Sequence, residues 1–560
     1  MKPSSSSTNI VNLSKLTIRQ AKMIDNISSD IYTQYNQIIE DIIDDFDLKG
    51  VQLLLTISCR NTFTNLLFDP ISKVLLLKKI IHQDSHIKIV KVANNQRNIV
   101  ESLNNIFKVK VDVINCNSTN NSVFFGIFLN IAKSAYTAFN DWFWFRLFRL
   151  KKTPTKPITY VDTFMYIDSV DISGVIQDRN YTGFESYLTQ AESDSIWLAP
   201  TIYGIKFPRQ YREICSKIRK TNSNILIQES WLSTLDYFIS FLCSVFVPIG
   251  VFLSSFRVKS KYSTILRSTL ISDIGSPALM LSFYRFLFIR RLSRNNVKIK
   301  GAVDWNENQT IDRALSLSFR RYYPDVTIRG YQGFPAKEYN PAYNPTCKEV
   351  SLGTVPHEMH VISQTHIDEK SIACKKLKIF PSGAFRYSYL YGFLDKRLAD
   401  DAHILFALPL LKEECGILVD HAIKLKNSMR GHITVQLKYH PAYTIESTVS
   451  KKLLKAKIEI TSKPSITLLE KTSLLVTSES GIAVEAVSLG IPVAIHGSVS
   501  GITLNPLLNV NHNTISIKYY DLDELITFSN KCVDYNFRNK CVNNLFFSIN
   551  RQNTSNLFTF

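Results

Sequence analysis

Hydrophobic and polar residues alternate along the chain with the spacing of strands and of amphipathic helices in turn. From Gly50 this pattern predicts strand, helix, strand, helix and strand, the order that begins a Rossmann-like parallel sheet. The expected elements are strands 51–58, 87–92 and 109–114 and helices 65–82 and 95–106. Residues 1–48 are first polar and then amphipathic, which predicts a helical leader before this sheet.

Two further series of strands and helices follow. The first, expected to complete the same sheet, comprises strands 158–164, 196–203, 225–228, 326–330 and 359–363 and a basic helix 209–220. The second comprises strands 404–408, 433–437, 457–460, 473–476, 493–495 and 514–517, with helices 413–428 and 522–547. The loop 380–383 lies between the series and is the expected hinge. The pattern therefore predicts an α/β protein of two Rossmann-like domains that face each other across a cleft.

These elements give the expected domain boundaries. A helical leader covers 1–48, an N-terminal Rossmann-like acceptor domain covers 49–380, a C-terminal Rossmann-like nucleotide-binding domain covers 381–535, and a tail, 536–560, packs back on the first domain.

Two apolar insertions, 123–152 and 237–261, interrupt the alternation in the N-terminal domain. The first is rich in Phe and Trp, and the second is almost wholly apolar with Pro248 near its middle. Each ends in basic residues: Arg146, Arg149, Lys151 and Lys152 in the first, and Arg257, Lys259 and Lys261 in the second. A bilayer span needs about twenty apolar residues, and a central proline favours a bent or re-entrant element. We expect attachment to the membrane interface, the alternative being core helices of a large domain.

Composition and charge agree with a folded protein that binds anions. Apolar residues make up 45% and charged residues 20% of the 560 positions, and Lys plus Arg exceed Asp plus Glu by 66 to 47. The resulting net charge of +19 attracts nucleic acid, anionic lipid or an acidic glycan. Because the basic residues flank aromatic stretches and form no long run, we expect an anionic membrane surface and no nucleic acid among the partners.

The cysteines and the first residues indicate the compartment. Nine cysteines are scattered without a C-x-x-C pair, which argues against a zinc site and against a disulfide framework. The first fifteen residues contain no apolar run typical of a secretory signal. We therefore expect a cytoplasmic protein attached peripherally to the inner membrane.

A hydroxyl-rich turn follows the expected strand 473–476. Ser478 and Ser480 lie where hydroxyl groups and the N–H of Gly481 converge at a helix start, which favours a bound phosphate. Glu485 lies on the first turns of that helix. The alternative is an ordinary capped helix in an α/β domain.

A second group of polar residues follows the strand 433–437. Lys438 and His440 come directly after it, at the carboxyl edge of the sheet where open α/β folds bind ligands. A single His before proline is more often a solvated surface residue. Its spacing from the serine turn favours a shared phosphate site.

These residues resemble a known family. The patterns K-x-H-P and S-x-S-G-x-x-x-E-A-x-x-x-G-x-P are similar to those of GT-B glycosyltransferases, and most of all to bacterial surface-polysaccharide enzymes of the sialyltransferase and Kdo-transferase type. Residues 304–315 and 330–333 are similar to the E-N…R-A-L and G-Y-Q-H blocks of such enzymes. The resemblance covers about residues 300–500. It departs at Gly333, where these enzymes tend to carry His.

The resemblance implies an inverting, metal-independent glycosyltransferase without a further cofactor. Its donor would be a CMP-activated acidic keto sugar, and its acceptor a glycan or lipid-linked glycan of a capsule, O-antigen or lipopolysaccharide. The implied phosphate-binding residues are Lys438, His440, Ser478, Ser480, Gly481 and Ser382, with Glu485 on the ribose and His440 also as general acid. Glu307 would be the base with Asp304 in reserve. Arg313, Tyr331, Gln332 and Arg386 would line the donor and acceptor pockets.

Other functions share these features. A CDP-glycerol-type polyol-phosphate transferase, a UDP-sugar GT-B transferase and a nucleotide-sugar epimerase would all place His and Ser around a phosphate. A basic protein that binds membrane or nucleic acid without catalysis is the non-enzymatic alternative.

Overall fold

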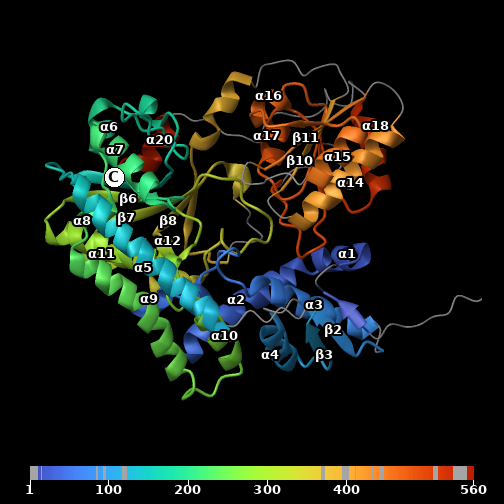
Figure 1. The fold of residues 1–560 in the computed structure, drawn as a ribbon, viewed down its shortest axis with the longest axis horizontal. Helices are drawn as coiled ribbons and strands as arrows, with labels where there is room; N and C mark the ends of the chain where they lie inside the picture. The colour runs from blue at the N-terminus through green and yellow to red at the C-terminus, as the bar shows by residue number, and fades with distance from the viewer. Residues whose placement is uncertain are drawn as a thin grey trace, which may run out of the picture.

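The computed structural model of the chain describes residues 10–13, 16–83, 86–92, 96–115, 123–367, 373–393, 403–409, 412–429, 433–440, 447–508, 515–533 and 551–560. Within these ranges the strands form three parallel sheets, two of six strands and one of three. The two larger sheets belong to separate Rossmann-like domains (Figure 1). The predicted α/β fold of GT-B type is confirmed.

The first large sheet has the strand order β5-β4-β6-β7-β8-β9. Its strands are β4 (Ile158–Met165), β5 (Ile196–Ile202), β6 (Ile299–Trp305), β7 (Thr327–Gln332), β8 (Glu358–Val361) and β9 (Lys378–Pro381). The chain order reverses between β4 and β6, so the crevice of this sheet opens at their carboxyl ends. The strands predicted near 158, 196, 326 and 359 are confirmed, whereas 225–228 contributes one bridge from Ile225 to Leu198 before the short helix α8 (Gln228–Trp231). The predicted hinge loop begins inside β9.

The second large sheet has the order β12-β11-β10-β13-β14-β15. Its strands are β10 (His403–Ala407), β11 (Thr434–Lys438), β12 (Glu459–Thr461), β13 (Leu474–Thr477), β14 (Val493–His496) and β15 (Ser516–Tyr519), and its helices are α14 (Lys412–Ser428), α15 (Ser447–Lys455), α16 (Ser465–Leu469), α17 (Ile482–Ser488) and α18 (Leu522–Val533). β10, β13 and β14 are buried at every position, as expected for central parallel strands covered on both faces. The strand order reverses between β10 and β13, which places a ligand crevice at their carboxyl ends.

The described residues between 10 and 115 form a unit of their own, contrary to the prediction that this part of the chain starts the first Rossmann sheet. β1 (Ile10–Asn12), β2 (Ile89–Val92) and β3 (Asp112–Asn115) pair in a separate three-stranded sheet. Its helices are α1 (Ile18–Asn26), α2 (Ser28–Asp45), α3 (Phe68–Gln83) and α4 (Arg97–Phe107). In Figure 1 these blue elements lie below the second large sheet.

The predicted strand 51–58 is wrong. These residues form the 3-10 helices η1 (Gly50–Leu54) and η2 (Thr56–Ser58). The backbone N–H and hydroxyl of Thr56 donate to the Asp273 carboxylate at 2.9 and 2.7 Å. The Asp273 side chain, distant in sequence, therefore accepts from the Thr56 N–H, a backbone group that a neighbouring strand would pair with in a sheet.

Helices lie around the first large sheet, some packed on its strands and others on neighbouring helices. They are α5 (Val123–Phe148), α6 (Gln190–Ser195), α7 (Pro208–Lys220), α9 (Thr234–Ser254), α10 (Ser263–Asp273), α11 (Pro277–Arg294), α12 (Thr310–Tyr322) and α13 (Cys347–Leu352). At the other end of the chain, α20 (Arg551–Phe558) returns to this sheet: the Arg329 guanidinium donates to the Thr559 carbonyl at 2.7 Å, and the Phe558 carbonyl accepts from the Thr159 hydroxyl at 3.4 Å.

One pair of cysteines departs from the sequence interpretation. Cys347, at the start of α13, forms a disulfide with Cys374. The two cysteines are 27 positions apart with β8 between them, so the pairing depended on tertiary contacts that the scattered spacing did not reveal.

A buried acid pair, Asp141 of α5 and Glu229 of α8, makes stability depend on pH. Burial raises the pKa of Glu229 to about 7 and that of Asp141 well above its usual range. Asp141 also accepts a hydrogen bond from the Tyr211 phenol. Both carboxyl groups therefore favour the protonated form in the folded protein.

Replacing Glu229 by Gln is expected to reduce the loss of stability between about pH 4.5 and pH 8. In this window the native state keeps a proton that the unfolded chain releases, so the free energy of unfolding falls as pH rises. The contribution of Glu229 is about 2–3 kcal/mol. Thermal unfolding across the window should give a smaller decline of Tm in the variant, and parallel declines would contradict this assignment.

Candidate functional site

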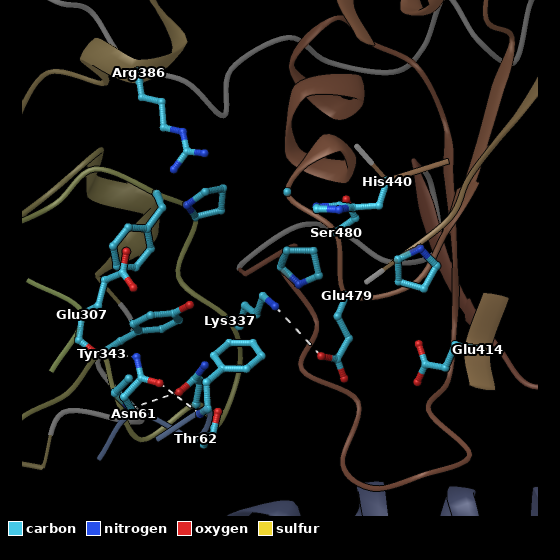
Figure 2. Close-up of a pocket in the computed structure, with 18 of the residues that line it drawn as sticks. Asn61, Thr62, Glu307, Lys337, Tyr343, Arg386, Glu414, His440, Glu479 and Ser480 are labelled. Carbon is cyan, nitrogen blue, oxygen red and sulfur yellow. Dashed lines mark hydrogen bonds and ion pairs between the residues drawn. The ribbon is translucent and has the colours of Figure 1, made fainter. Parts of the chain in front are cut away.

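A pocket of ≈ 340 Å³ lies between the two large sheets (Figure 2). Its wall comes from the carboxyl ends of strands in both Rossmann-like domains and from loops between them. The lining residues are Asn61, Thr62, Phe63, Glu307, Phe334, Pro335, Lys337, Asn340, Ala342, Tyr343, Arg386, Tyr387, Pro409, Glu414, His440, Glu479, Ser480, Gly481 and Pro506. Pro409 follows β10 and Ser480 follows β13, so the pocket includes the crevice at which the second sheet reverses its strand order.

The second domain contributes the serine turn and an imidazole. The Ser480 N–H donates to the Ser478 carbonyl at 2.8 Å, and the Thr477 hydroxyl joins the end of β13 to the Ala407 carbonyl of β10 at 2.8 Å. His440 lies two residues beyond β11 and lines the same pocket as Ser480. Burial, and then the nearby Lys438 ammonium, lower the pKa of its imidazole, so the ring favours the neutral form.

Two carboxyl groups of the second domain, neither of them predicted from a motif, complete this wall. Glu414, on α14, is fully buried, and Glu479 lies inside the serine turn. Burial raises the pKa of Glu479 to about 7 against the opposing effect of Lys337, whose ammonium lies 3.9 Å from its Oε2. Figure 2 shows both carboxyl groups on the same side of the pocket as His440.

Glu307 and Arg386 come from the first domain. The Trp305 indole donates to Glu307 Oε1 at 2.9 Å, and the Gln309 amide donates to Oε2 at 2.8 Å. These two bonds hold the half-buried carboxylate at the end of β6. Arg386 is exposed on η6 (Phe385–Phe393), and its guanidinium extends into the space between the domains (Figure 2).

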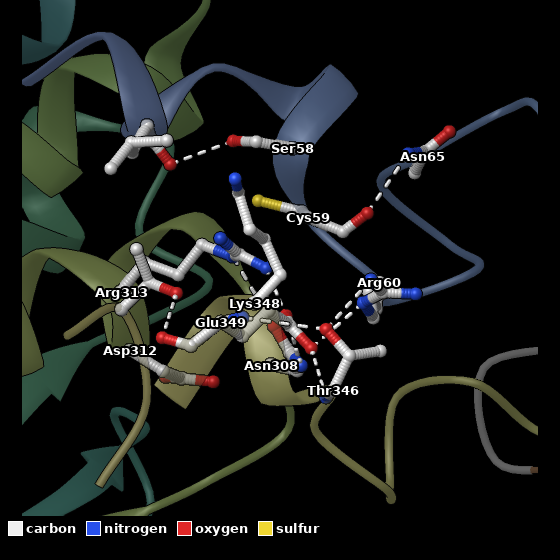
Figure 3. Close-up of polar contacts among 12 residues, drawn as sticks. Ser58, Cys59, Arg60, Asn65, Asn308, Asp312, Arg313, Thr346, Lys348 and Glu349 are labelled. Carbon is white, nitrogen blue, oxygen red and sulfur yellow. Dashed lines mark hydrogen bonds and ion pairs between the residues drawn. The ribbon is translucent and has the colours of Figure 1, made fainter. Parts of the chain in front are cut away.

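The loop 61–63 reaches this pocket from the N-terminal unit, and neither it nor the Lys337–Tyr343 segment was predicted. The Asn61 amide donates to the Glu307 carbonyl at 3.0 Å. Beside it, the guanidinium groups of Arg60 and Arg313 both pair with the Glu349 carboxylate, Arg60 Nε lying 2.7 Å from Oε2 (Figure 3). This buried triad joins the N-terminal unit to the first Rossmann domain directly behind the pocket wall.

Asp304 and Arg313 do not line the pocket, contrary to prediction. Asp304 is fully buried and accepts a hydrogen bond from the Asn306 amide at 2.8 Å, and burial raises its pKa well above the usual range. A protonated carboxyl group in this position is a poor base. Arg313 is engaged by Glu349 and by Asn308, whose Oδ1 is 3.3 Å away. Its guanidinium is therefore structural and not a clamp for a donor.

Tyr331, Gln332 and Ser382 also lie outside the pocket lining. The Tyr331 phenol is buried and donates to the Gly383 carbonyl at 2.6 Å. The buried Ser382 hydroxyl lies 2.9 Å from His360 Nδ1. The Gln332 amide donates to the Tyr343 carbonyl at 3.0 Å, so it positions a lining residue without facing the pocket itself.

The departure at Gly333 has a steric cause. A Cβ at this position would lie 2.4 Å from Cζ3 of Trp305 and 2.5 Å from Cε1 of Tyr331. The chain therefore excludes a His side chain where the resembled family tends to carry one.

Three residues of the predicted phosphate group lie near the pocket without lining it. The Lys438 ammonium donates to the Lys463 carbonyl at 2.6 Å. Ser478 is fully buried, and its hydroxyl has no hydrogen-bond partner in the described part of the chain. Burial raises the pKa of Glu485 to about 7, against the effects of the Tyr389 phenol and the Arg386 guanidinium. Of the predicted phosphate and donor residues, the pocket therefore brings together His440, Ser480, Gly481 and Arg386.

Comparison with known proteins gives similarity of structure alone. No protein-family model matches the chain, and no curated protein matches its sequence. A structure described as a UDP-N-acetylglucosamine 2-epimerase from Listeria monocytogenes is 13% identical, with a TM-score of 0.41 over 72% of this chain and 94% of that one. The lipopolysaccharide outer core galactosyltransferase WaaB is 10% identical, with a TM-score of 0.38 over 72% and 99%. Phytolacca americana UGT2 complexed with UDP-2-fluoro-glucose and pterostilbene is 11% identical, with a TM-score of 0.37 over 73% and 94%. At these scores the similarity does not extend to activity or substrate.

Proposed function

We propose that the protein transfers a sugar from a nucleotide-sugar donor to a hydroxyl group of a glycan or lipid-linked glycan in the pocket between its Rossmann-like domains. The observation that supports this most is that Glu307 lines one wall of the pocket while His440, Ser480 and Gly481 line the other. A carboxylate base and a set of hydrogen-bond donors on opposite walls match the needs of glycosyl transfer, in which one group is deprotonated as another departs.

The donor phosphates would lie against the second domain. A neutral His440 can donate one ring N–H to a phosphate oxygen, and Ser480 can donate its hydroxyl. Arg386 supplies the positive charge, because its exposed guanidinium extends into the pocket. The lowered pKa of His440 favours stabilisation of the leaving phosphate by a hydrogen bond over protonation by an imidazolium.

The charge of the pocket bears on which sugar is carried. Three carboxyl groups line it, those of Glu307, Glu414 and Glu479, against two cationic side chains, those of Lys337 and Arg386. Glu479, whose pKa is raised to about 7, contributes only part of a negative charge near neutral pH. All three carboxyl groups accept hydrogen bonds from sugar hydroxyls, and their ionised forms repel the carboxylate of an acidic keto sugar. This supports a neutral, hydroxyl-rich sugar on a nucleotide such as UDP over the CMP-linked acidic sugar that the motifs first indicated.

Nucleotide binding tests the donor side of this proposal. We expect a nucleoside diphosphate to raise the Tm of the wild type and the His440→Ala variant to bind it about 10- to 100-fold more weakly, the effect of losing one hydrogen bond to a charged group. Thermal shift and calorimetry with UDP, CDP and CMP are the measurements. His82→Ala is the matched control, because His82 is exposed at the end of α3. Equal affinities in both variants would contradict the phosphate role of His440.

Product analysis separates the alternatives that share this pocket. Incubation with UDP-, CDP- and CMP-sugars, with and without a glycan acceptor and Mg²⁺, should release nucleotide only when the acceptor is present and equally without the metal. Conversion of the donor to its epimer in the absence of acceptor would indicate an epimerase, and transfer of a polyol phosphate would indicate the other transferase. Absence of nucleotide binding would leave the non-enzymatic alternative.

A further inference from the structure

α5 and α9 pack side by side in opposite directions on the first domain (Figure 1). The Trp142 indole of α5 donates to the Thr234 hydroxyl at the start of α9 at 3.2 Å. Further along, Gly275 joins the two helices: its carbonyl accepts from the Ser134 hydroxyl of α5 at 2.7 Å, and its N–H donates to the Ser244 carbonyl of α9 at 2.9 Å. The first turns of α5 therefore lie at the same end of the pair as the last turns of α9.

Large apolar side chains at this shared end are uncovered. On α5, Phe124 is 83% and Phe128 65% exposed, and Phe256, just after α9, is 60% exposed. The pair also exposes Phe125, Leu129, Phe139, Phe143, Leu147, Leu235, Phe238, Phe246 and Leu253. α9 is, within the described ranges, the helix long and apolar enough to cross a membrane by length and composition, yet only 28% of its most apolar window is buried. Soluble monomers rarely leave so large an apolar surface exposed.

The segment that follows α9 is basic, and the carboxylates beside it, Asp41 and Asp45 of α2, accept hydrogen bonds from the Tyr262 and Ser260 hydroxyls at 2.7 and 2.6 Å. Exposed Arg257, Lys259 and Lys261 follow α9 directly, and Lys133 is exposed on α5. The sequence contains no Asp or Glu from 123 to 140 or from 237 to 272. A second copy of the chain docked through the same face would place these cations opposite the same cations, which repel them. An anionic surface would instead pair with them and neutralise their charge.

We propose that this end of the α5–α9 pair, formed by Phe124, Phe125, Phe128, Leu253, Phe256, Arg257, Lys259 and Lys261, is the surface by which the protein docks on an anionic lipid bilayer. The phenyl rings enter the boundary between headgroups and acyl chains, and the cations contact lipid phosphates. Pro248, near the middle of α9, and the packing of α9 on α5, α10 and α11 favour docking at the interface over a span. The inference is independent of the reaction in the pocket between the domains.

Co-sedimentation of the full chain with vesicles tests this surface. We expect binding to phosphatidylcholine vesicles that contain about 30% phosphatidylglycerol, and at least tenfold weaker binding to phosphatidylcholine alone or in about 0.5 M salt. The double variant Arg257→Glu/Lys259→Glu should bind the anionic vesicles at least 25-fold more weakly, since each cation contributes roughly fivefold. Phe124→Ser/Phe128→Ser should also bind more weakly, with the same Tm as the wild type because both rings are exposed.

Leu454→Ser is the matched control, since Leu454 is 78% exposed on α15 of the other Rossmann domain. It should bind as the wild type does. The proposal is overturned if the wild type ignores anionic vesicles, if the tip variants bind as well as the control, or if bound protein resists extraction by high salt and alkaline carbonate. The last result would indicate that α9 spans the bilayer.

Discussion

The Glu307→Gln variant is expected to transfer sugar about 10²- to 10⁴-fold more slowly than the wild type, the usual contribution of a general base. Glutamine keeps the shape of the side chain and one acceptor oxygen for the Trp305 indole or the Gln309 amide. It has no basic oxygen to accept the proton of the acceptor hydroxyl. The fold and the nucleotide-binding wall should therefore survive while kcat falls.

Asp304→Asn is the matched control for this experiment. Asp304 precedes Glu307 by three residues, but it is buried beside Asn306 and its raised pKa keeps it protonated. An amide in place of a neutral carboxyl group preserves the acceptor oxygen for the Asn306 side chain. We expect its kcat to stay within several-fold of the wild type.

Steady-state kinetics and nucleotide affinity should be measured on both variants. A fall in kcat with unchanged donor affinity in Glu307→Gln assigns the residue to the chemical step. A large loss in Asp304→Asn together with near-normal turnover in Glu307→Gln would reverse the assignment and show that the base acts from within the first sheet.

Local sequence patterns predicted most of the second domain because its central strands β10, β13 and β14 are buried along their whole length. A parallel strand covered on both faces is a continuous apolar run, as in Leu474–Thr477 and Val493–His496, and such runs are visible without tertiary information. The same reasoning placed Ser480 and His440 at carboxyl ends of strands, and the structure brings them into one pocket.

In the first domain, local motifs were less reliable in predicting which residues line the pocket. Arg313 lies on the helix after β6, and Tyr331 lies at the end of β7. Glu349 pairs with the Arg313 guanidinium, and the Gly383 carbonyl accepts from the Tyr331 phenol. Both partners lie more than thirty residues away in sequence. Whether an arginine faces a pocket or a buried carboxylate depends on such contacts, and periodicity does not encode them.

The loop 61–63 was missed for a related reason. Its surroundings were interpreted as the first strand of the Rossmann sheet, whereas the chain forms 3-10 turns and delivers Asn61 to Glu307 from a third unit. No motif marks this loop, since Asn, Thr and Phe are ordinary surface residues. The nearest signal in the sequence was Arg60, a charged residue directly after an apolar run. In the structure its side chain is fully buried.

Glu349→Ala is expected to lower the free energy of unfolding of the N-terminal half by about 3–5 kcal/mol, the cost of breaking a buried ion pair from one side. Glu349 is 1% exposed and lies between Arg60 and Arg313, which are both fully buried. Removing the carboxylate takes away the anion that the two guanidinium groups share and leaves Arg60 paired with Glu40, whose Oε1 lies 3.5 Å from Arg60 Nη2 (Figure 3). The Thr346 N–H also loses its acceptor at 2.9 Å, which loosens the start of α13.

Urea unfolding followed by tryptophan fluorescence measures this loss, with Glu101→Ala as the control. Glu101 pairs with Arg97 on the surface of α4, where both side chains are more than two-fifths exposed, so its removal should have a much smaller effect. Because Arg60 immediately precedes Asn61, which donates to the Glu307 carbonyl, Glu349→Ala should also weaken turnover at temperatures where it remains folded. Equal stability of the two variants would mean that the triad is not what joins the N-terminal unit to the pocket wall.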